Sequence, residues 1–229
     1  MGGGNCNHDE RPTPDRASAK VPARSGVGRS NTVHWRAPRR SSNLRDTMKQ
    51  QTCEICILAG GLSRRMGKDK ARLRLGRRTM LARIRAEARA TGLAVRVIRR
   101  DAVPRCGPLG GIYTALKTTR AEAVLFLACD MPFVTAQLLQ LVLDSAADQS
   151  CLFVRSNGVA GFPFLLSRAS LPTVTAQIEA GRFSVQGLAK ALEARLVRLP
   201  SKLAAQLRNI NTPAELLRAR RLWENRPGV

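Results

Sequence analysis

Short apolar segments alternate with longer amphipathic segments from residue 53 onward, and this alternation limits the choice of fold more than any other feature of the chain. The apolar segments are bounded by turn residues, as buried strands are, and cover residues 53–58, 94–98, 123–129, 151–154 and 195–199. Helical patterns lie between them over residues 79–90, 109–117, 135–147, 167–180 and 185–194. Strands alternating with helices require crossover connections. We therefore expect an α/β fold: one three-layer, doubly wound, mostly parallel sheet.

A last helix is predicted near the C-terminus by its start signals. Thr212 suits the N-cap, Pro213 suits the first helical position, and Glu215 lies where it closes a capping box. Just before it, Asn209 and Asn211 are one residue apart in a strand-like segment, which would point both side chains the same way.

Residues 1–47 differ in composition from the rest of the chain. They are rich in Gly, Pro, Ser and Arg, hold few aliphatic residues, and carry nine basic and four acidic residues. Such a stretch buries too little apolar surface to offset the entropy lost on ordering, and it lacks the apolar core of a signal peptide. We expect a disordered basic tail or a mis-assigned start, with translation beginning at Met48, and a domain over residues 48–229. An RNA-binding arm is the alternative.

The charge is strongly positive: 39 Lys and Arg against 16 Asp and Glu give a formal net charge of +23. This balance favours polyanionic partners. The longest apolar run, residues 123–129, is too short to span a membrane. Six cysteines are too few for a disulfide scaffold, so we expect a reduced, cytoplasmic protein. Cys53 and Cys56 would face opposite sides of a strand, which argues against a redox or zinc pair.

The loop after the first strand carries glycines and cations. Gly60, Gly61 and Gly67 allow backbone N–H groups to approach a ligand closely. Arg64, Arg65, Lys68 and Lys70 lie among these glycines, and a strand-loop-helix arrangement points such donors at an anion. The segment predicts a triphosphate-binding loop, although it has neither a Walker A sequence nor a Gly-x-Gly-x-x-Gly sequence. A glycine turn beside a solvated basic patch is the alternative.

Two further segments of the sequence have residues that could bind the same triphosphate ligand. Asp130 follows the strand at 123–129, and open α/β sheets bind ligands at the carboxyl ends of their strands. A carboxylate there can hold Mg²⁺ together with substrate phosphates, or it can simply cap the next turn. The second segment is Gly-Pro-Leu-Gly-Gly at 107–111. Its glycines permit close approach of the backbone to a flat ligand, although a helix N-terminus alone would explain it.

These segments together resemble the nucleotidyltransferases that include molybdenum cofactor guanylyltransferase (MobA-type). The match in the first loop runs Leu58-Ala59-Gly60-Gly61-x-Ser63-x-Arg65-Met66-Gly67-x-Asp69-Lys70. The resemblance implies a Rossmann-like nucleotidyltransferase fold with GTP in this loop. It also implies that Arg65 and Lys70 are catalytic cations, and that the nucleotide is bound by Lys70 and by the backbone of Leu58, Ala59, Gly60 and Gly61.

The resemblance extends to three later segments. Cys129-Asp130-Met131-Pro132 is similar to the family's Cys-Asp-x-Pro, which implies a catalytic Asp130 that binds Mg²⁺. The segment of Gly107, Pro108 and Leu109 would lie against guanine, with Asp101 in the nucleotide site. Residues 209–216 are similar to the family's Asn-x-Asn-Thr-Pro-x-Glu-Leu, which implies that Asn209 and Asn211 face the cleft.

The chain departs from the family pattern at two places. Residues 92–101 leave room for one short strand where the family usually has a further strand, and this bears on the assignment of Asp101. In residues 161–166, similar to the family's pterin-facing segment, Phe162 takes the position of a His, so a hydrogen-bond donor to the acceptor is missing.

The resemblance implies transfer of GMP from GTP to the phosphate of molybdopterin or its molybdenum form, with release of pyrophosphate and Mg²⁺ as cofactor. Molybdoenzymes or cofactor-carrier proteins are further partners that it admits. A cytidylyl or sugar-phosphate transferase, a degenerate assembly adaptor and a basic nucleic-acid-binding protein are the alternatives. If the protein binds nucleic acid, its affinity should fall steeply with added salt and show no selectivity among nucleotides. That function would not require Asp130 at the end of a strand.

Overall fold

A computed structural model describes residues 52–60, 70–146, 149–156 and 158–224. The expected tail at 1–47 and the expected domain start at Met48 lie outside the described residues, so both stay predictions. Among the described residues, no helix is long and apolar enough to cross a membrane.

A six-stranded sheet forms the centre of the described region, with strand order β4-β1-β5-β7-β6-β8. Every neighbouring pair is parallel except the two that β7 makes with β5 and β6. In that order, the strands are Ala94–Ile98, Cys53–Leu58, Ala123–Ala128, Val159–Ser167, Cys151–Ser156 and Arg195–Arg198. The mostly parallel sheet expected from the alternating pattern is confirmed.

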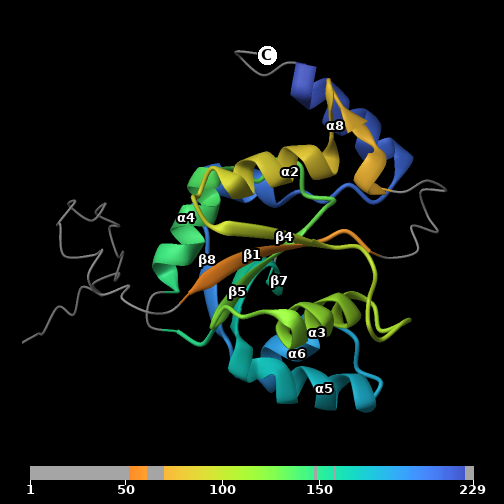
Figure 1. The fold of residues 1–229 in the computed structure, drawn as a ribbon. Coiled ribbons are helices and arrows are strands. Elements are labelled where there is room, and N and C mark those ends of the chain that lie inside the picture. The colour runs from red at the N-terminus through yellow and green to blue at the C-terminus, as the bar shows by residue number, and fades with distance from the viewer. Residues whose placement is uncertain (1–51, 61–69, 147–148, 157, 225–229) are drawn as a thin grey trace, which may run out of the picture. The chain divides into compact units, whose positions relative to one another are not determined.

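Helices cover both faces of this sheet (Figure 1). Helices α2 (Met80–Arg89) and α4 (Ala136–Ser145) pack on one face. Helices α3 (Pro108–Thr118), α5 (Leu171–Glu179) and α6 (Val185–Ala191) pack on the other. The described region is therefore a three-layer, doubly wound α/β structure, as predicted.

Two apolar cores follow from the alternation of side chains along the strands. In β1, Ile55 and Ile57 pack with α2 and α4, whereas Cys56 packs with α3 on the opposite face. Cys53 packs on the first of these faces, so the two thiols diverge as expected. Burial raises the pKa of Cys53 to about 11 and that of Cys56 to about 12. Both are therefore protonated thiols at neutral pH, which agrees with a packing role.

A third apolar cluster lies beside the main sheet. Helix α8 (Pro213–Glu224) covers a short hairpin of β2 (Arg74–Leu75) and β3 (Arg78–Thr79). The cluster is formed by Leu75, Met80, Phe133, Ile210, Leu216 and Ala219. It joins the segment after residue 70, the turn after β5 and the start of α8. The described residues also form the short helices η1 (Lys70–Arg72), η2 (Arg168–Ser170), α7 (Ser201–Ala204) and η3 (Ala205–Leu207).

The structure differs from the sequence-based expectation most clearly at β7. The expected strands did not include residues 159–167, a segment that holds Gly161 and Pro163, two residue types uncommon inside strands. Phe153 pairs with Phe164 but the next residue, Val154, pairs with Gly161, so Pro163 falls at an irregularity in the β6–β7 pairing. Pro lacks the N–H that a regular ladder would need, and a bulge avoids that need. The helix predicted over 167–180 is also wrong at its start, because β7 continues to Ser167 and α5 begins at Leu171.

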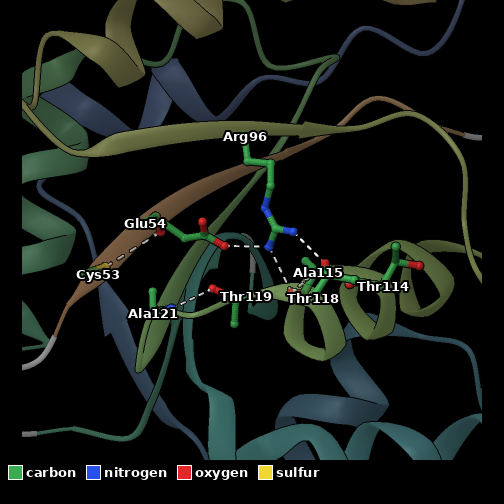
Figure 2. Close-up of polar contacts among 8 residues, drawn as sticks. All are labelled: Cys53, Glu54, Arg96, Thr114, Ala115, Thr118, Thr119 and Ala121. Carbon is green, nitrogen blue, oxygen red and sulfur yellow. Dashed lines mark hydrogen bonds and ion pairs between the residues drawn. The ribbon is translucent and has the colours of Figure 1, made fainter.

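An ion pair ties the edge of the sheet to α3 (Figure 2). Arg96 of β4 donates to Glu54 of β1 at 2.6 Å, to the Ala115 carbonyl at 2.9 Å and to the Thr118 hydroxyl at 2.5 Å. Because these partners come from β1 and α3 while Arg96 lies on β4, the guanidinium holds the edge strand, its neighbour and the last turns of α3 together.

Candidate active site

The loops that follow β1, β4 and β5 meet at one edge of the sheet. The Ala59 N–H donates to the Ile98 carbonyl at 2.8 Å, and the Cys129 N–H donates to the Leu58 carbonyl at 3.1 Å. Parallel strands end at the same edge, and in open α/β sheets that edge binds ligands. The structure therefore brings together the segments that contain three of the predicted groups of site residues.

Lys70, Asp130 and Asn211 form a hydrogen-bonded group at this edge. The Lys70 ammonium donates to Asp130 Oδ2 at 3.3 Å and to Asn211 Oδ1 at 2.5 Å. The three residues come from η1, the turn after β5 and the segment before α8, and 141 positions separate Lys70 from Asn211 in the sequence. A cation, a carboxylate and an amide thus converge as the sequence predicted.

Asp130 has an unusual electrostatic environment. Burial raises the pKa of its carboxyl above the ordinary Asp value, and this effect outweighs the opposing effect of the Lys70 ammonium. Its Oδ1 atom is buried and has no hydrogen-bond partner among the described residues. A buried acceptor without a partner carries a desolvation penalty, so it marks either strain or a ligand site.

The free oxygen of Asp130 fits a divalent cation. A carboxylate oxygen is a hard ligand, and Mg²⁺ usually uses one or two carboxylates together with waters and substrate phosphates. The described residues contain no group of three or more His, Cys, Asp or Glu side chains placed to hold a metal alone. The donor set therefore suits a metal that is bound jointly with a phosphate ligand.

Asp101 and three glycines form a second group at the same edge. A Cβ atom added at Gly60 would lie 3.4 Å from Asp101 Oδ1 and 3.0 Å from the Arg99 carbonyl oxygen. One added at Gly110 would lie 3.1 Å from Asp101 Oδ2, and one at Gly111 would lie 3.3 Å from Asp101 Oδ1. The carboxylate thus lies among backbone atoms that only glycine leaves accessible.

The predicted nucleotide segment contributes Gly110 and Gly111 to this group, and its role in nucleotide binding stays a prediction. These two glycines approach Asp101 most closely. Gly107 and Pro108 are exposed, and Gly107 has the positive φ of 54° that favours glycine. Leu109 is fully buried in the core, so only its backbone remains available to a ligand.

The two asparagines do not lie in the strand-like segment that the sequence predicted, and their roles in the cleft stay predictions. Residues 208–211 form no strand, and Asn209 is exposed whereas Asn211 contacts Lys70. The capping box of α8 accounts for the difference, because Glu215 accepts hydrogen bonds from the N–H groups of Asn211 and Thr212 and bends the chain there. Sequence reasoning recognised this box as a helix signal and missed its contact with Asn211.

Three other predicted residues are Gly61, Arg65 and Phe162, of which the structure describes only Phe162. Gly61 and Arg65 lie outside the described residues, so their roles stay predictions. Phe162 belongs to β7, which runs antiparallel to β5 and begins at the edge where β5 ends. Its ring is partly buried, 4.8 Å from that of Phe164.

A cavity of about 490 Å³ lies away from this edge, lined by Arg120, Ala121, Glu122, Ser167, Arg168 and Ala169. These residues precede β5 and follow β7, at the amino end of β5. We place the site at the carboxyl end because the buried free carboxylate oxygen and the glycine-lined Asp101 lie there.

The chain is similar to known proteins of one family. Residues 55–199 match the model of the MobA-like NTP transferase domain. The probable molybdenum cofactor guanylyltransferase of Pelotomaculum thermopropionicum is 29% identical over 190 residues, which cover 74% of this chain and 92% of that protein.

Two solved structures share the fold. Molybdopterin-guanine dinucleotide biosynthesis protein A from Archaeoglobus fulgidus has a TM-score of 0.59 and 20% identity, over 76% of this chain and all of that one. The 2-C-methyl-D-erythritol 4-phosphate cytidylyltransferase from Thermus thermophilus has a TM-score of 0.57 and 20% identity, over 75% and 98%. The family match covers more than half of this chain, which therefore belongs to the MobA-like NTP transferase domain family, a family of nucleotidyltransferases.

Proposed function

We propose that this protein transfers GMP from GTP to the terminal phosphate of molybdopterin or its molybdenum form and releases pyrophosphate. The observation that carries the proposal is the pairing of Lys70 with Asp130, whose other carboxylate oxygen is buried and free of protein partners among the described residues. The choice of GTP and molybdopterin rests on the names of the relatives.

The nucleoside end of GTP would bind at the group around Asp101. Its carboxylate can accept hydrogen bonds from the donors of a ligand, and Gly60, Gly110 and Gly111 let a flat ring or a sugar approach the backbone. Burial raises the pKa of Asp101 above the ordinary Asp value. Hydrogen bonds from a bound nucleoside would offset that desolvation.

The triphosphate would lie toward Lys70 and Asp130. Phosphoryl and nucleotidyl transfers depend mainly on positioning and on the neutralisation of charge that develops on phosphate oxygens. The Lys70 ammonium supplies a positive charge held by two side-chain acceptors. Arg65 would supply a second cation by the family resemblance. When bound on Asp130, Mg²⁺ would neutralise charge on the triphosphate oxygens.

Both substrates of the reaction are anions, so the attacking phosphate must come close to the triphosphate against charge repulsion. Cations at the site reduce this repulsion, and a net charge of +23 gives the chain a field that attracts anions from solution. The acceptor would enter beside the start of β7, where the partly buried Phe162 could contribute apolar contact to a flat heterocycle.

Pyrophosphate release with purified protein, GTP, Mg²⁺ and molybdopterin tests the proposal. We expect release that depends on both substrates, and a dinucleotide product that contains guanine. CTP in place of GTP is the matched control, and we expect a much lower rate with it. Equal or greater turnover with CTP would mean that the enzyme does not select guanine, and GTP would no longer be the assigned substrate. Absence of turnover with either nucleotide would contradict the transfer reaction.

A further inference from the structure

Glu215 connects the start of α8 to the charged group at the sheet edge. Its Oε2 atom accepts from the Asn211 N–H at 2.6 Å and from the Thr212 N–H at 3.0 Å. The Thr212 hydroxyl accepts from the Glu215 N–H at 3.2 Å, which completes the capping box. The first of these contacts reaches one residue beyond the cap, to the residue that binds Lys70.

The segment that carries Asn211 is held on both sides. The Ile210 N–H donates to the Asp130 carbonyl at 2.9 Å, and the Ile210 side chain is fully buried in the third apolar cluster. Glu215 fixes the following peptide through its carboxylate. Asn211 thus lies between two anchors, and its amide oxygen is aimed at the Lys70 ammonium, 2.5 Å away.

Among the described residues, two side chains hold the Lys70 ammonium in position. The Lys70 side chain is about one-fifth exposed, and its hydrogen-bond partners among the described residues are Asp130 at 3.3 Å and Asn211 at 2.5 Å. A lysine side chain has several rotatable bonds and loses much rotamer freedom when it is fixed. The shorter of the two contacts, from Asn211, is therefore the main restraint on the ammonium in the described part of the protein.

We infer that Glu215 is a positioning residue for nucleotidyl transfer, acting through Asn211 to hold the Lys70 ammonium against Asp130. This inference rests on the proposed function for its catalytic consequence. The backbone N–H of Asn211 is the main cause that lowers the pKa of Glu215, so the carboxylate is charged at neutral pH. The helix cap therefore has two roles: it starts α8 and it orients a cation of the site.

Three variants separate positioning from helix capping. Glu215→Ala removes the contact with Asn211 together with half of the capping box. Thr212→Ala removes only the other half, the hydroxyl that accepts from Glu215, and leaves Asn211 held. Glu215→Gln keeps an oxygen that can replace Oε2, because that single atom accepts both hydrogen bonds and Gln serves the same cap.

We expect Glu215→Ala to lower kcat by about 10-fold to 100-fold, the size of effect found for groups that orient catalytic ligands. Glu215→Gln should stay within about twofold of the unmodified protein, because the same box accepts Gln. Thr212→Ala should lower the melting temperature about as much as Glu215→Ala but leave kcat unchanged. In a Lys70→Met background, Glu215→Ala should have little further effect on kcat, because residues that act as a unit are not additive.

Reactivity of Lys70 gives a second readout that needs no turnover. Acetylation of the nucleotide-free protein by an N-hydroxysuccinimide ester, followed by mass spectrometry, measures how accessible the Lys70 amine is to a reagent in solution. Glu215→Ala should raise the Lys70 acetylation rate severalfold, whereas Thr212→Ala and Glu215→Gln should not.

The two readouts distinguish failure of the inference from failure of the proposed function. Equal kcat and equal Lys70 acetylation in Glu215→Ala and Thr212→Ala would reduce Glu215 to a helix cap and overturn the inference. If the unmodified protein transfers no nucleotide while acetylation still responds to Glu215→Ala alone, the positioning of Lys70 stands and the proposed reaction fails.

Discussion

Two ion pairs between described residues differ in the buried atom that each leaves without a hydrogen-bond partner. Arg96 and Glu54 join β4 to β1 at 2.6 Å, and Lys70 and Asp130 join η1 to the turn after β5 at 3.3 Å. All four side chains are largely buried. In the first pair the free buried atom is the Arg96 Nε, a cationic donor, and in the second it is the Asp130 Oδ1, an anionic acceptor.

The difference separates a structural pair from a functional one. Both terminal nitrogens of Arg96 bind atoms of the fold, on β1 and on α3 (Figure 2). A guanidinium repels metal ions, so its remaining N–H offers nothing to a cation. Asp130 keeps a hard oxygen at the edge where ligands bind. We therefore expect loss of the first pair to lower stability, and loss of the second to lower activity.

The largest effect is expected from Asp130→Asn. Removing the charge should lower kcat by about 10²-fold to 10³-fold, as loss of one preorganised electrostatic contact does in other enzymes. The melting temperature should be unchanged or higher, because the change removes a carboxylate that burial disfavours. Steady-state kinetics and thermal unfolding of the same preparation measure both. Activity close to that of the unmodified protein would remove Asp130 from the mechanism.

Arg96→Met should show the opposite pattern. The change leaves Glu54 without its cation, which we expect to lower the free energy of unfolding by about 2–3 kcal/mol, less than for a fully buried pair because both groups are partly exposed. Urea unfolding measures this loss, and kcat of the folded protein should be kept. Glu54→Gln, which retains an acceptor, is the matched control and should have a smaller effect. A selective loss of kcat in Arg96→Met would break the distinction between the pairs.

Gly110→Ala tests the glycines around Asp101, for comparison with the changes in the two ion pairs. An added Cβ would lie 2.6 Å from the backbone oxygen of Val103, so the chain must shift, at a cost of about 1–2 kcal/mol in stability. The shift also displaces Asp101, so the KM for GTP should rise more than kcat falls. Gly161→Ala, whose Cβ would meet no atom within 4 Å, is the control for stability. Equal unfolding free energies for the two variants would show that the close approach at Gly110 is not needed.

The smallest effect concerns pH in the metal-free protein. Because burial raises the folded-state pKa of Asp130, the folded state holds this proton more tightly than the unfolded state does. This group therefore adds to the free energy of unfolding below the ordinary Asp pKa of about 3.9. The contribution is lost as pH rises through the raised pKa that Asp130 has in the folded state. The free energy of unfolding should be measured for the unmodified protein and for Asp130→Asn at each pH. The value for the unmodified protein minus the value for the variant should fall as pH rises over that window. A difference that grows with pH would mean that Lys70 outweighs burial.

Sequence patterns predicted the fold well where a segment was regular on its own. The runs at 53–58 and 94–98 coincide with β1 and β4 because each is short, apolar and bounded by turn residues. β7 could not be predicted in this way, because its stability comes from pairing on both sides and from a bulge that accommodates Pro163.

The site shows the same limit. Lys70 and Asp130 were predicted from their motifs, and the structure places them in contact. That Asn211 rather than Asn209 reaches Lys70 depends on how the capping box bends the chain and on burial of Ile210. The contacts of Asn211 with Lys70 and of Ile210 with Asp130 join segments far apart in the sequence, and no local pattern records such contacts.

Binding of Mn²⁺ as a Mg²⁺ substitute tests the central claim most directly. Electron paramagnetic resonance titration with a GTP analogue that resists cleavage between the α- and β-phosphates counts the metal bound with the nucleotide. We predict that Asp130→Asn binds Mn²⁺ in the nucleotide complex at least 10-fold more weakly than the unmodified protein, as loss of a metal ligand should. Equal Mn²⁺ affinity in the two proteins would contradict the assignment of the free Asp130 oxygen to a metal.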